Sequence, residues 1–287
     1  MTDLQSVQPK VTKASRLETL VWSSMEIGTF ARHIDQVKRG MSHNPAFIDL
    51  RMDLNYSLNF REVRRILEDS GIIPTLHLPS DPCWRPMDFP KEIVPYIDIG
   101  AEVGAELVTT HSALSTLFYS DDDIDSFLEW VPLLNDTAKE SGMQLAVETL
   151  GLYYTELTLL FERCADMKIA LDIGHGQIMA TRNRALDVIQ SFYDHIAIVN
   201  VHDNHGAQMV SKVRDLRQQR EVAHEELLVI AREYDEHLPI GKGGIDFAPI
   251  FRELKEEGYS GKFLMMCKDP DRFPSERDKF TQIWLEA

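Results

Sequence analysis

The stretch QLAVETLGLYYTELTLLFERCADMKIALDIGH (144–175) contains two short, almost continuously apolar runs, 144–150 and 168–174. An amphipathic, helix-prone segment, 155–166, lies between them. Runs that stay apolar at nearly every position are typical of strands buried on both faces, as in parallel sheets that helices cover. The order strand, helix, strand therefore predicts a βαβ unit of a parallel sheet.

The same alternation continues through the chain in both directions. Strands are expected at 17–23, 46–52, 72–78, 106–112, 144–150, 168–174, 196–202 and 262–268. Helices are expected near 29–39, 60–70, 91–104, 122–141, 155–166, 184–192, 246–257 and 274–286. Eight such units in a chain of 287 residues favour a single (β/α)8 TIM barrel over an open doubly wound sheet.

The chain is expected to form one domain, a barrel over 16–287, after a flexible N-terminus at 1–15. The segment 206–234 departs from an even barrel because it is long, polar and largely helix-prone. It is interpreted as a helical insertion after the seventh strand. A loop of this length at the C-terminal face of a barrel is usually a lid, a specificity loop or a subunit contact. An extra helix without such a role is the alternative.

The composition indicates which kinds of binding partner are favoured. The chain carries 30 basic and 46 acidic residues, a net charge of −16, and 44% of its residues are hydrophobic. Such a surface repels phosphate backbones, so nucleic acid is disfavoured as a partner, although a local basic groove is not excluded. A small molecule is expected instead. A homo-oligomer is possible, and the sequence does not decide the oligomeric state.

The cysteines and the termini indicate a cytoplasmic protein without a membrane span. Cys83, Cys164 and Cys267 are far apart and odd in number, which favours reduced, buried thiols over disulfides. The first fifteen residues lack the apolar stretch of a signal peptide. No apolar run is long enough to span a membrane.

Histidines and carboxylates lie at or just after the C-terminal ends of six consecutive predicted strands or units, where the active sites of barrels form. They are His77, His111, Glu148, Asp172, His175, His202, Asp235 and His237. Imidazole and carboxylate are the ligand types that hold zinc, manganese or magnesium, so the set predicts a divalent metal site. Any single histidine is more simply explained as a hydrogen-bonded rim or core residue. Glu148 and Asp172 are harder to explain in that way, because a carboxylate within an apolar strand is costly to bury without a cation or hydrogen-bond donors.

Other motifs of catalysis are absent or weak. GKGG (241–244) lacks the spacing and the terminal Ser or Thr of a phosphate-binding P-loop, and no GxSxG nucleophile elbow exists. Lys242 and Lys268 lie close in sequence to the predicted site and are candidates for binding an anionic substrate group. Solvated lysines are the equal alternative.

The strings LAVETLG, IALDIGHG, VNVHDNHG, DEHLPIGKGGIDF and GYSGKFLMMCKD together resemble the xylose isomerase-like TIM barrels. This superfamily joins sugar phosphate isomerases and epimerases with apurinic endonucleases of the endonuclease IV type. The resemblance implies a metal held by Glu148, Asp172 and His202, with His77 and His175 facing the substrate. In the endonuclease-like members, further metals are held by residues that match His77, His111, His175, Asp235 and His237.

Three positions depart from the family pattern. Met266 stands where family members normally have one more glutamate, Lys242 stands where glutamate is common, and the 206–234 segment is usually missing. In the isomerases and epimerases that last glutamate is both a metal ligand and one of two acid/base groups. A thioether is a poor ligand for hard ions. Met266 therefore counts against both standard activities.

Three functions remain as hypotheses. The first is a metal-dependent isomerase or epimerase of a small sugar or sugar phosphate, with Glu148 as the base and water, His175 or the insertion returning the proton. The second is a barrel that binds a metal or a small molecule without catalysis. The third is an endonuclease IV-like phosphodiester hydrolase, which the many ligand-type residues favour and the acidic charge opposes.

Overall fold

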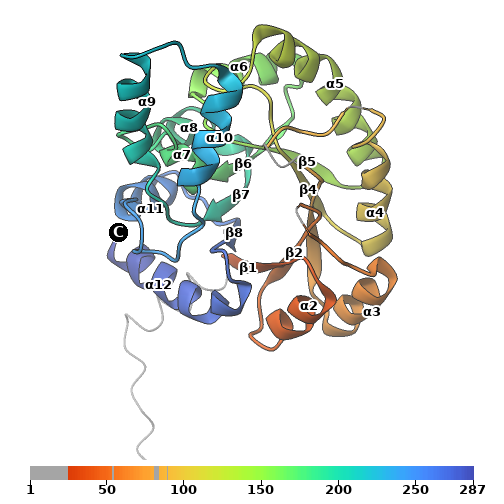
Figure 1. The fold of residues 1–287 in the computed structure, drawn as a ribbon. Helices are drawn as coiled ribbons and strands as arrows, with labels where there is room; N and C mark the ends of the chain where they lie inside the picture. Colours follow the sequence, from red (N-terminus) through yellow and green to blue (C-terminus); the bar gives the residue numbers. More distant parts are fainter. Residues whose placement is uncertain (1–24, 54, 81–83, 89) are drawn as a thin grey trace, which may run out of the picture.

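The eight strands form a closed parallel barrel in which each strand pairs with its sequence neighbour and β1 also pairs with β8 (Figure 1). The computed structural model describes residues 25–53, 55–80, 84–88 and 90–287. The strands are β1 (Glu26–Ala31), β2 (Phe47–Arg51), β3 (Ile73–His77), β4 (Leu107–Thr110), β5 (Gln144–Glu148), β6 (Lys168–Asp172), β7 (Ile196–Val201) and β8 (Lys262–Met265). The TIM barrel that the alternating runs predict is thus confirmed.

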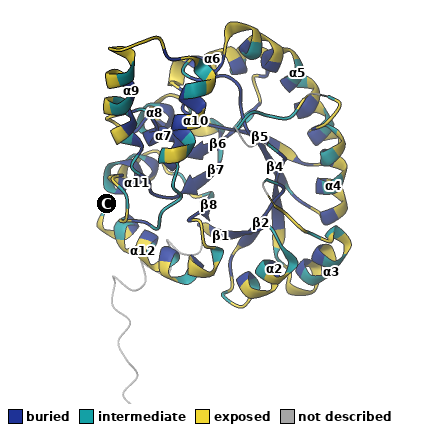
Figure 2. Cartoon of the chain, viewed as in Figure 1, coloured by how far each residue is buried: buried dark blue, intermediate teal, exposed yellow. Residues whose placement is uncertain are grey.

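A ring of helices covers the outside of the barrel (Figure 1). The helices of the ring are α2 (Ile34–Met41), α3 (Phe60–Ser70), α4 (Pro95–Val103), α5 (Asp121–Glu140), α6 (Tyr154–Arg163), α8 (Ala185–Phe192), α11 (Phe247–Glu256) and α12 (Phe273–Glu286). Each helix turns a buried face toward the strands and an exposed face toward solvent, as Figure 2 shows. This arrangement explains the two sequence patterns, because the strands are buried on both faces and the helices on only one.

The apolar side chains form two separate cores. One fills the inside of the barrel and includes Phe30, Phe47, Leu107, Ile198 and Leu264. The larger core lies between the strands and the surrounding helices. Since side chains fill the barrel, it is a packed scaffold rather than a pore, and only the loops and strand ends at its mouth are free to form a site.

The beginning of the chain differs from the expectation. The strand expected at 17–23 lies outside the described residues. The first strand of the barrel is β1 (Glu26–Ala31), and the helix expected at 29–39 starts only at Ile34. The charged Glu26 and the Gly28 inside EIGTFA hide the strand pattern. Gly28 is required there, because a Cβ atom would lie 2.5 Å from the ring of Phe47.

Two further differences lie near the barrel mouth. A one-turn helix, α7 (Ile173–Gln177), follows β6 and has no periodicity that a sequence could reveal. The 206–234 segment forms a 3-10 turn, η2 (Gly206–Gln208), and two helices, α9 (Met209–Arg217) and α10 (His224–Tyr234). Two other 3-10 turns, η1 (Tyr193–His195) and η3 (Pro270–Arg272), precede β7 and α12. Helix α10 lies across the edge of the barrel mouth in Figure 1.

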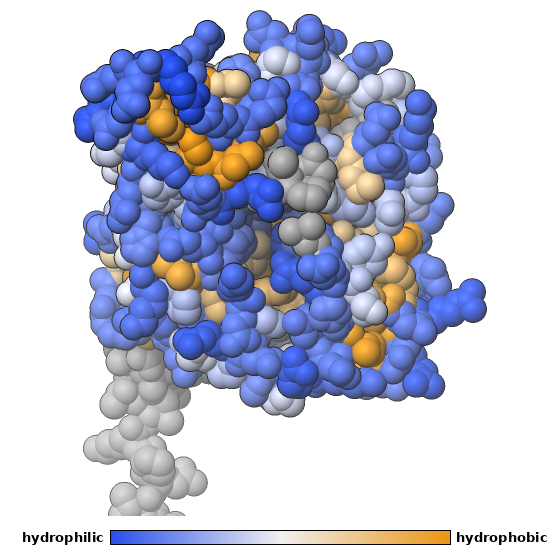
Figure 3. Space-filling model, in the orientation of Figure 1, coloured by the Kyte–Doolittle hydropathy of each residue, from blue (hydrophilic) through white to orange (hydrophobic). Residues whose placement is uncertain are grey.

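The surface is largely hydrophilic, in keeping with the acidic composition (Figure 3). An apolar strip appears at the upper left of Figure 3, in the region of α9 and α10, and Val229 of α10 is 49% exposed. In the part of the chain that the structure describes, no helix is long and apolar enough to cross a membrane.

Candidate metal centre at the mouth of the barrel

Glu148, the last residue of β5, is the centre of a buried cluster. Its Oε2 atom lies 3.0 Å from Nε2 of His77 and 3.6 Å from Nε2 of His111, at the ends of β3 and β4. Its Oε1 atom lies 3.1 Å from Nδ1 of His175. The side chain of Glu148 is completely buried. Three neighbouring barrel strands and α7 thus direct their polar groups at one carboxylate, as parallel strand ends allow.

A second part of the cluster continues across β6 and β7 into the loop after α10. Nε2 of His202 lies 3.0 Å from Oδ1 of Asp172, and Nε2 of His175 lies 3.4 Å from Oδ2 of Asp235. Asp235 also lies 3.0 Å from His237, whose ring stacks on the ring of His202 with centroids 3.9 Å apart. The structure therefore brings all eight predicted histidines and carboxylates into one continuous cluster, and their roles remain a prediction.

The orientation of three imidazole rings fits metal ligands. Nδ1 of His77, His111 and His237 each lies 2.9 Å from a backbone carbonyl oxygen, which only an N–H can satisfy. In the neutral ring, Nε2 is then an unprotonated acceptor. In all three residues Nε2 points at a carboxylate of the cluster, Glu148 or Asp235. Two electron-rich atoms that face each other need a proton or a metal ion between them, and this backbone-fixed tautomer is typical of metal-binding histidines.

Several buried polar atoms of the cluster have no hydrogen-bond partner. Buried polar groups in proteins are nearly always hydrogen-bonded, so unpaired ones call for an explanation. Among the described residues, the fully buried cluster atoms without a hydrogen bond are Glu148 Oε1, Asp172 Oδ2, both ring nitrogens of His175, His202 Nδ1 and Asp235 Oδ1. Ligand atoms within 4.8 Å of one another form three groups, which are His77–His111–Glu148, Glu148–Asp172–His175 and His175–His202–Asp235–His237. The residues present therefore fit one or more divalent ions.

The close contacts and the burial of the cluster shift the pKa values of its members in opposite directions. Burial would raise the pKa of Glu148, but His111 and His175 hold it well below its usual range. Burial lowers the pKa of His111 to about 4, so this ring is neutral near pH 7 and is free to act as a ligand. Burial would also lower the pKa of His175, yet Asp172 raises it well above its ordinary value. A metal that binds here must therefore displace a proton from His175.

His237 is held in a strained backbone conformation. Its φ is 47°, a left-handed value that non-glycine residues seldom adopt. Its carbonyl oxygen accepts a hydrogen bond from the Lys268 amide at 2.7 Å, which ties the loop to the end of β8. Strain of this kind persists at functional sites, where the surrounding structure fixes a side chain in place.

Asp203 holds that loop from beneath. Its two oxygens accept hydrogen bonds from the backbone amides of Asn204, Gly241, Gly243 and Ile245 at 2.9 to 3.1 Å. Asp203 therefore positions the loop that carries Asp235 and His237 rather than a single imidazole. His205, two residues further along the chain, pairs with Glu236 outside the buried cluster.

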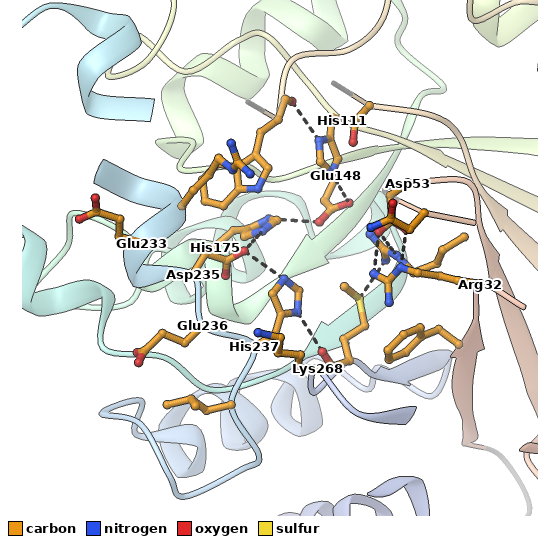
Figure 4. A pocket seen from close by; sticks show the side chains of 18 of the residues that line it. Arg32, Asp53, His111, Glu148, His175, Glu233, Asp235, Glu236, His237 and Lys268 are labelled. Carbon is orange, nitrogen blue, oxygen red and sulfur yellow. Dashed lines mark hydrogen bonds and ion pairs between the residues drawn. The ribbon is translucent and has the colours of Figure 1, made fainter. Parts of the chain in front are cut away.

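A cavity of about 820 Å³ opens above the cluster (Figure 4). His111, Glu148, His175, Asp235 and His237 line it, whereas the buried His77, Asp172 and His202 lie behind this lining. Of the two lysines suggested for substrate binding, Lys268 lines the cavity. Lys242 is exposed and is not among the lining residues. The volume is sufficient for a small ligand.

The sequence reading missed several residues of this cavity. Arg51, at the end of β2, is buried and donates a hydrogen bond from Nη1 to the Met266 sulfur at 3.3 Å. Its Nε donates to Asp53 at 2.9 Å. Trp84 lines the cavity next to the ring of His175, with centroids 5.2 Å apart. A signal for Arg51 was present, because Asp49, Arg51 and Asp53 alternate through the apolar run AFIDLRM and its next residue.

Gly174 is a point at which this centre can be tested. A Cβ atom on Gly174 would lie 2.0 Å from Cε1 and 2.3 Å from Nε2 of His202. The substitution Gly174→Ala is therefore expected to displace the His202 ring from Asp172. The free energy of unfolding should fall by about 1–3 kcal/mol, as for other overpacked cores. Metal affinity should fall at least about tenfold, since misplaced ligands cost that much even in the outer shell.

The measurement is a competition titration against a chromophoric chelator, with thermal unfolding in parallel. Gly244→Ala is the matched control, because a Cβ there meets only the Asn204 carbonyl oxygen at 3.8 Å. Equal metal affinity in the two variants would show that His202 is not a ligand.

A closed parallel barrel, with a histidine–carboxylate cluster at its C-terminal mouth that could hold a metal ion, is a TIM barrel with a candidate metal site. Within that class, the chain belongs to the xylose isomerase-like TIM barrel family, whose sequence model matches residues 33–282. The family that the sequence strings resemble is thereby confirmed.

Two curated relatives are archaeal proteins without an assigned activity. The chain is 25% identical over 176 residues to the uncharacterized protein MJ1614 of Methanocaldococcus jannaschii, a match that covers 59% of this chain and 57% of the relative. It is 23% identical over 172 residues to the uncharacterized protein MJ1311 of the same organism, covering 56% and 50%. The chain thus spans about half the length of the curated relatives it matches.

Solved structures share the fold. A D-tagatose 3-epimerase-like protein superposes with a TM-score of 0.64 at 19% identity, covering 91% of this chain and 97% of that one. An L-ribulose 3-epimerase gives 0.64 at 14% identity, with coverages of 91% and 95%. The IOLI protein, whose structure holds a zinc atom, gives 0.67 at 14% identity, with coverages of 91% and 99%. At these identities the likeness concerns the fold.

Proposed function

We propose that this protein is a divalent metal-dependent isomerase or epimerase of a small, sugar-like substrate, with Glu148 as the base. The observation that carries the proposal is the set of backbone-fixed imidazoles whose Nε2 atoms point at buried carboxylates below a cavity of about 820 Å³. The sugar epimerases among the structural neighbours support the substrate class.

Glu148, Asp172 and His202 would hold the catalytic ion, and the imidazole-rich surroundings favour zinc or manganese over magnesium. When bound, the ion would stabilise negative charge that develops on a carbonyl oxygen of the substrate. Glu148 would take the proton from the carbon beside that carbonyl. Its Oε1 atom lacks a hydrogen bond and belongs to a residue that lines the cavity.

His175 would return the proton in place of the strand-eight glutamate that Met266 replaces. Its Nδ1 atom lies 3.1 Å from Oε1 of Glu148, and the ring lines the same cavity. Trp84 beside His175 offers an apolar face for the carbon side of a polyol. The insertion would cover the mouth, because α10 contributes Arg232 and Glu233 to the lining.

A second candidate is metal-dependent hydrolysis of a phosphodiester. Glu148 and His175 link three groups of possible ligands, which are more than a single ion needs. Two or more ions a few ångströms apart would act as a clamp on the attacking and leaving oxygens of a phosphate ester. The net charge of −16 disfavours a nucleic-acid substrate for such a reaction.

Metal analysis by mass spectrometry is the first test. We expect at least one zinc or manganese ion per chain. One ion favours the isomerase reaction, and two or three favour hydrolysis. No metal at all would favour the remaining alternative that Met266 raises, a non-catalytic barrel, in the form that binds only a small molecule. The direct test is solvent-deuterium exchange at the carbon beside the carbonyl of a ketose panel, and exchange no faster than in buffer would contradict the isomerase proposal.

Removal of the metal should also destabilise the protein. An ion present at about a thousand times its dissociation constant stabilises the folded state by about 4 kcal/mol. For a chain of this size, the melting temperature should fall by roughly 8–16 °C when a chelator is added. Acid should have the same effect, since protons compete for the imidazoles. Differential scanning calorimetry with chelator, and again after metal is restored, measures this; a melting temperature insensitive to chelator would contradict metal binding.

A further inference from the structure

The cavity has a cationic wall opposite the imidazole cluster. Arg32 and Arg51 lie at the ends of β1 and β2, and Lys268 follows the end of β8. These three strands are neighbours in the barrel, because β1 pairs with both β2 and β8. The predicted metal ligands come from the other strands, β3 to β7, and from the loop after α10. The cavity is therefore divided into a metal-binding side and a cationic side.

Arg51 presents an incompletely satisfied guanidinium to this cavity. Its Nη1 atom donates only to the thioether sulfur of Met266, which is a weak acceptor that a ligand oxygen would outcompete. Its Nη2 atom has no hydrogen-bond partner among the described residues, and it is not one of the fully enclosed polar atoms. Although burial would lower the pKa of Arg51, Asp53 and Asp49 raise it above its ordinary value, so the group stays charged.

The wall carries more positive than negative charge. Asp53 serves two guanidiniums at once, because Arg32 contacts both of its oxygens at 2.5 and 2.7 Å and Arg51 contacts one. Asp49 lies 3.7 Å from Arg51 and already accepts a hydrogen bond from a threonine hydroxyl. Lys268 has no ion-pair partner among the described residues. Three cations thus face two carboxylates.

The acidic residues of the opposite rim do not cancel this excess. Figure 4 shows Glu233 and Glu236 across the cavity from Arg32 and Asp53. Glu233 pairs with Lys212 at 2.6 Å, and Glu236 pairs with His205 at 2.7 Å. Glu233 therefore has a cationic partner, and Glu236 is engaged in hydrogen bonds with His205. In a chain with a net charge of −16, a cationic wall inside the cavity calls for a ligand.

We propose that the substrate carries a carboxylate or a phosphate monoester, which Arg32, Arg51 and Lys268 bind while its hydroxyl and carbonyl oxygens face the imidazole cluster. This inference rests on the proposed function and names its substrate class. Guanidinium forks match the two oxygens of such groups, and charge-assisted hydrogen bonds are about twice as strong as neutral ones. Met266 has its own part in this arrangement: a glutamate there would neutralise Arg51, whereas the thioether leaves the guanidinium available.

The test is equilibrium binding of three matched probes to the metal-loaded protein at physiological salt. The probes are D-glucuronate, D-glucose 6-phosphate and neutral D-glucose, which differ in the group at one end. We expect one of the two anions to bind at least tenfold more tightly than glucose, and the tighter anion identifies the source of the charge. Arg32→Gln and Lys268→Gln should each weaken that anion about tenfold, the usual cost of one hydrogen bond to a charged group.

Arg61→Gln is the control, because Arg61 is a 92% exposed arginine of α3 outside the cavity. Arg51→Met is added only as a third variant, since it removes the buried cation between Asp49 and Asp53 and will lower stability. Anions that bind no better than glucose, or anion binding equally strong in Arg32→Gln, Lys268→Gln and Arg61→Gln, would overturn the inference. Exchange with neutral ketoses would then still uphold the proposed function. Anion binding without exchange on any substrate would leave this inference standing and overturn the proposed function.

Discussion

Replacing Glu148 with glutamine is expected to lower the rate of solvent-deuterium exchange at least about a thousandfold, within the range that a positioned acid/base group contributes. The reason is that Glu148 is a completely buried carboxylate that contacts three imidazoles and also lines the cavity. An amide cannot take the proton. It also presents N–H donors to imidazole rings, so we expect the ion held by His77 and His111 to be lost as well.

The control for this variant is Glu156→Gln. Glu156 is equally buried, but it lies in α6, where it accepts hydrogen bonds from Thr116 and from the backbone of Tyr153. That substitution should lower stability while metal content and exchange stay unchanged. Circular dichroism and mass spectrometry on both proteins separate loss of fold from loss of chemistry. If Glu148→Gln exchanges deuterium as fast as Glu156→Gln, Glu148 is not the base.

Most of the barrel could be predicted because burial leaves a clear trace in the sequence. Strands β2 to β8 are buried on both faces along most of their length, so each run predicts its strand to within a few residues. Strand β1 could not be placed in this way. Glu26 at its start and Gly28 within it break the apolar run, and the need for glycine arises only from the Phe47 ring in the neighbouring strand.

The metal-binding side of the cavity could be predicted from the sequence, whereas the cationic side could not. Most imidazoles and carboxylates of the metal side lie at or just after the end of a strand, so barrel topology gathers them. Asp235 and His237 instead follow α10. The cationic side depends on a contact between Arg51 and Met266, which lie 215 residues apart. Only barrel closure through β1 brings the ends of β2 and β8 close together. From the sequence, Met266 is simply a missing glutamate; in the structure it is also the partner of a buried guanidinium.

The substitution Asp203→Asn is expected to have the largest effect on stability. The carboxylate is completely buried and accepts four backbone N–H groups, two on each oxygen. Asparagine keeps one oxygen and turns an NH2 group toward two amide donors. Two charge-assisted hydrogen bonds are lost at about 1.5–3 kcal/mol each. The free energy of unfolding should therefore fall by about 3–6 kcal/mol, and the melting temperature by roughly 6–24 °C.

The same variant also tests whether the ligands of the loop and those of β3 to β5 bind metal independently. Asp203 holds the 241–245 backbone, and a Cβ on Gly243 would lie 2.4 Å from its carboxylate, so the loop has no room to adjust. When the loop shifts, Asp235 and His237 should leave the cluster, while His77, His111 and Glu148 on β3 to β5 stay in place. We therefore expect metal bound by the loop to be lost and metal held by the β3–β5 group to remain.

Asp246→Asn is the matched control for this substitution. Asp246 is the exposed N-cap of α11, where asparagine caps as well as aspartate, so stability and metal content should be unchanged. Calorimetry and metal analysis of the two variants give the comparison. If Asp203→Asn melts within about 2 °C of Asp246→Asn, a shift too small for the loss of even one charged hydrogen bond, the carboxylate does not organise the loop. If the loop is disrupted and all bound metal is lost, the ions depend on one another, and the cluster binds as a single centre through Glu148 and His175.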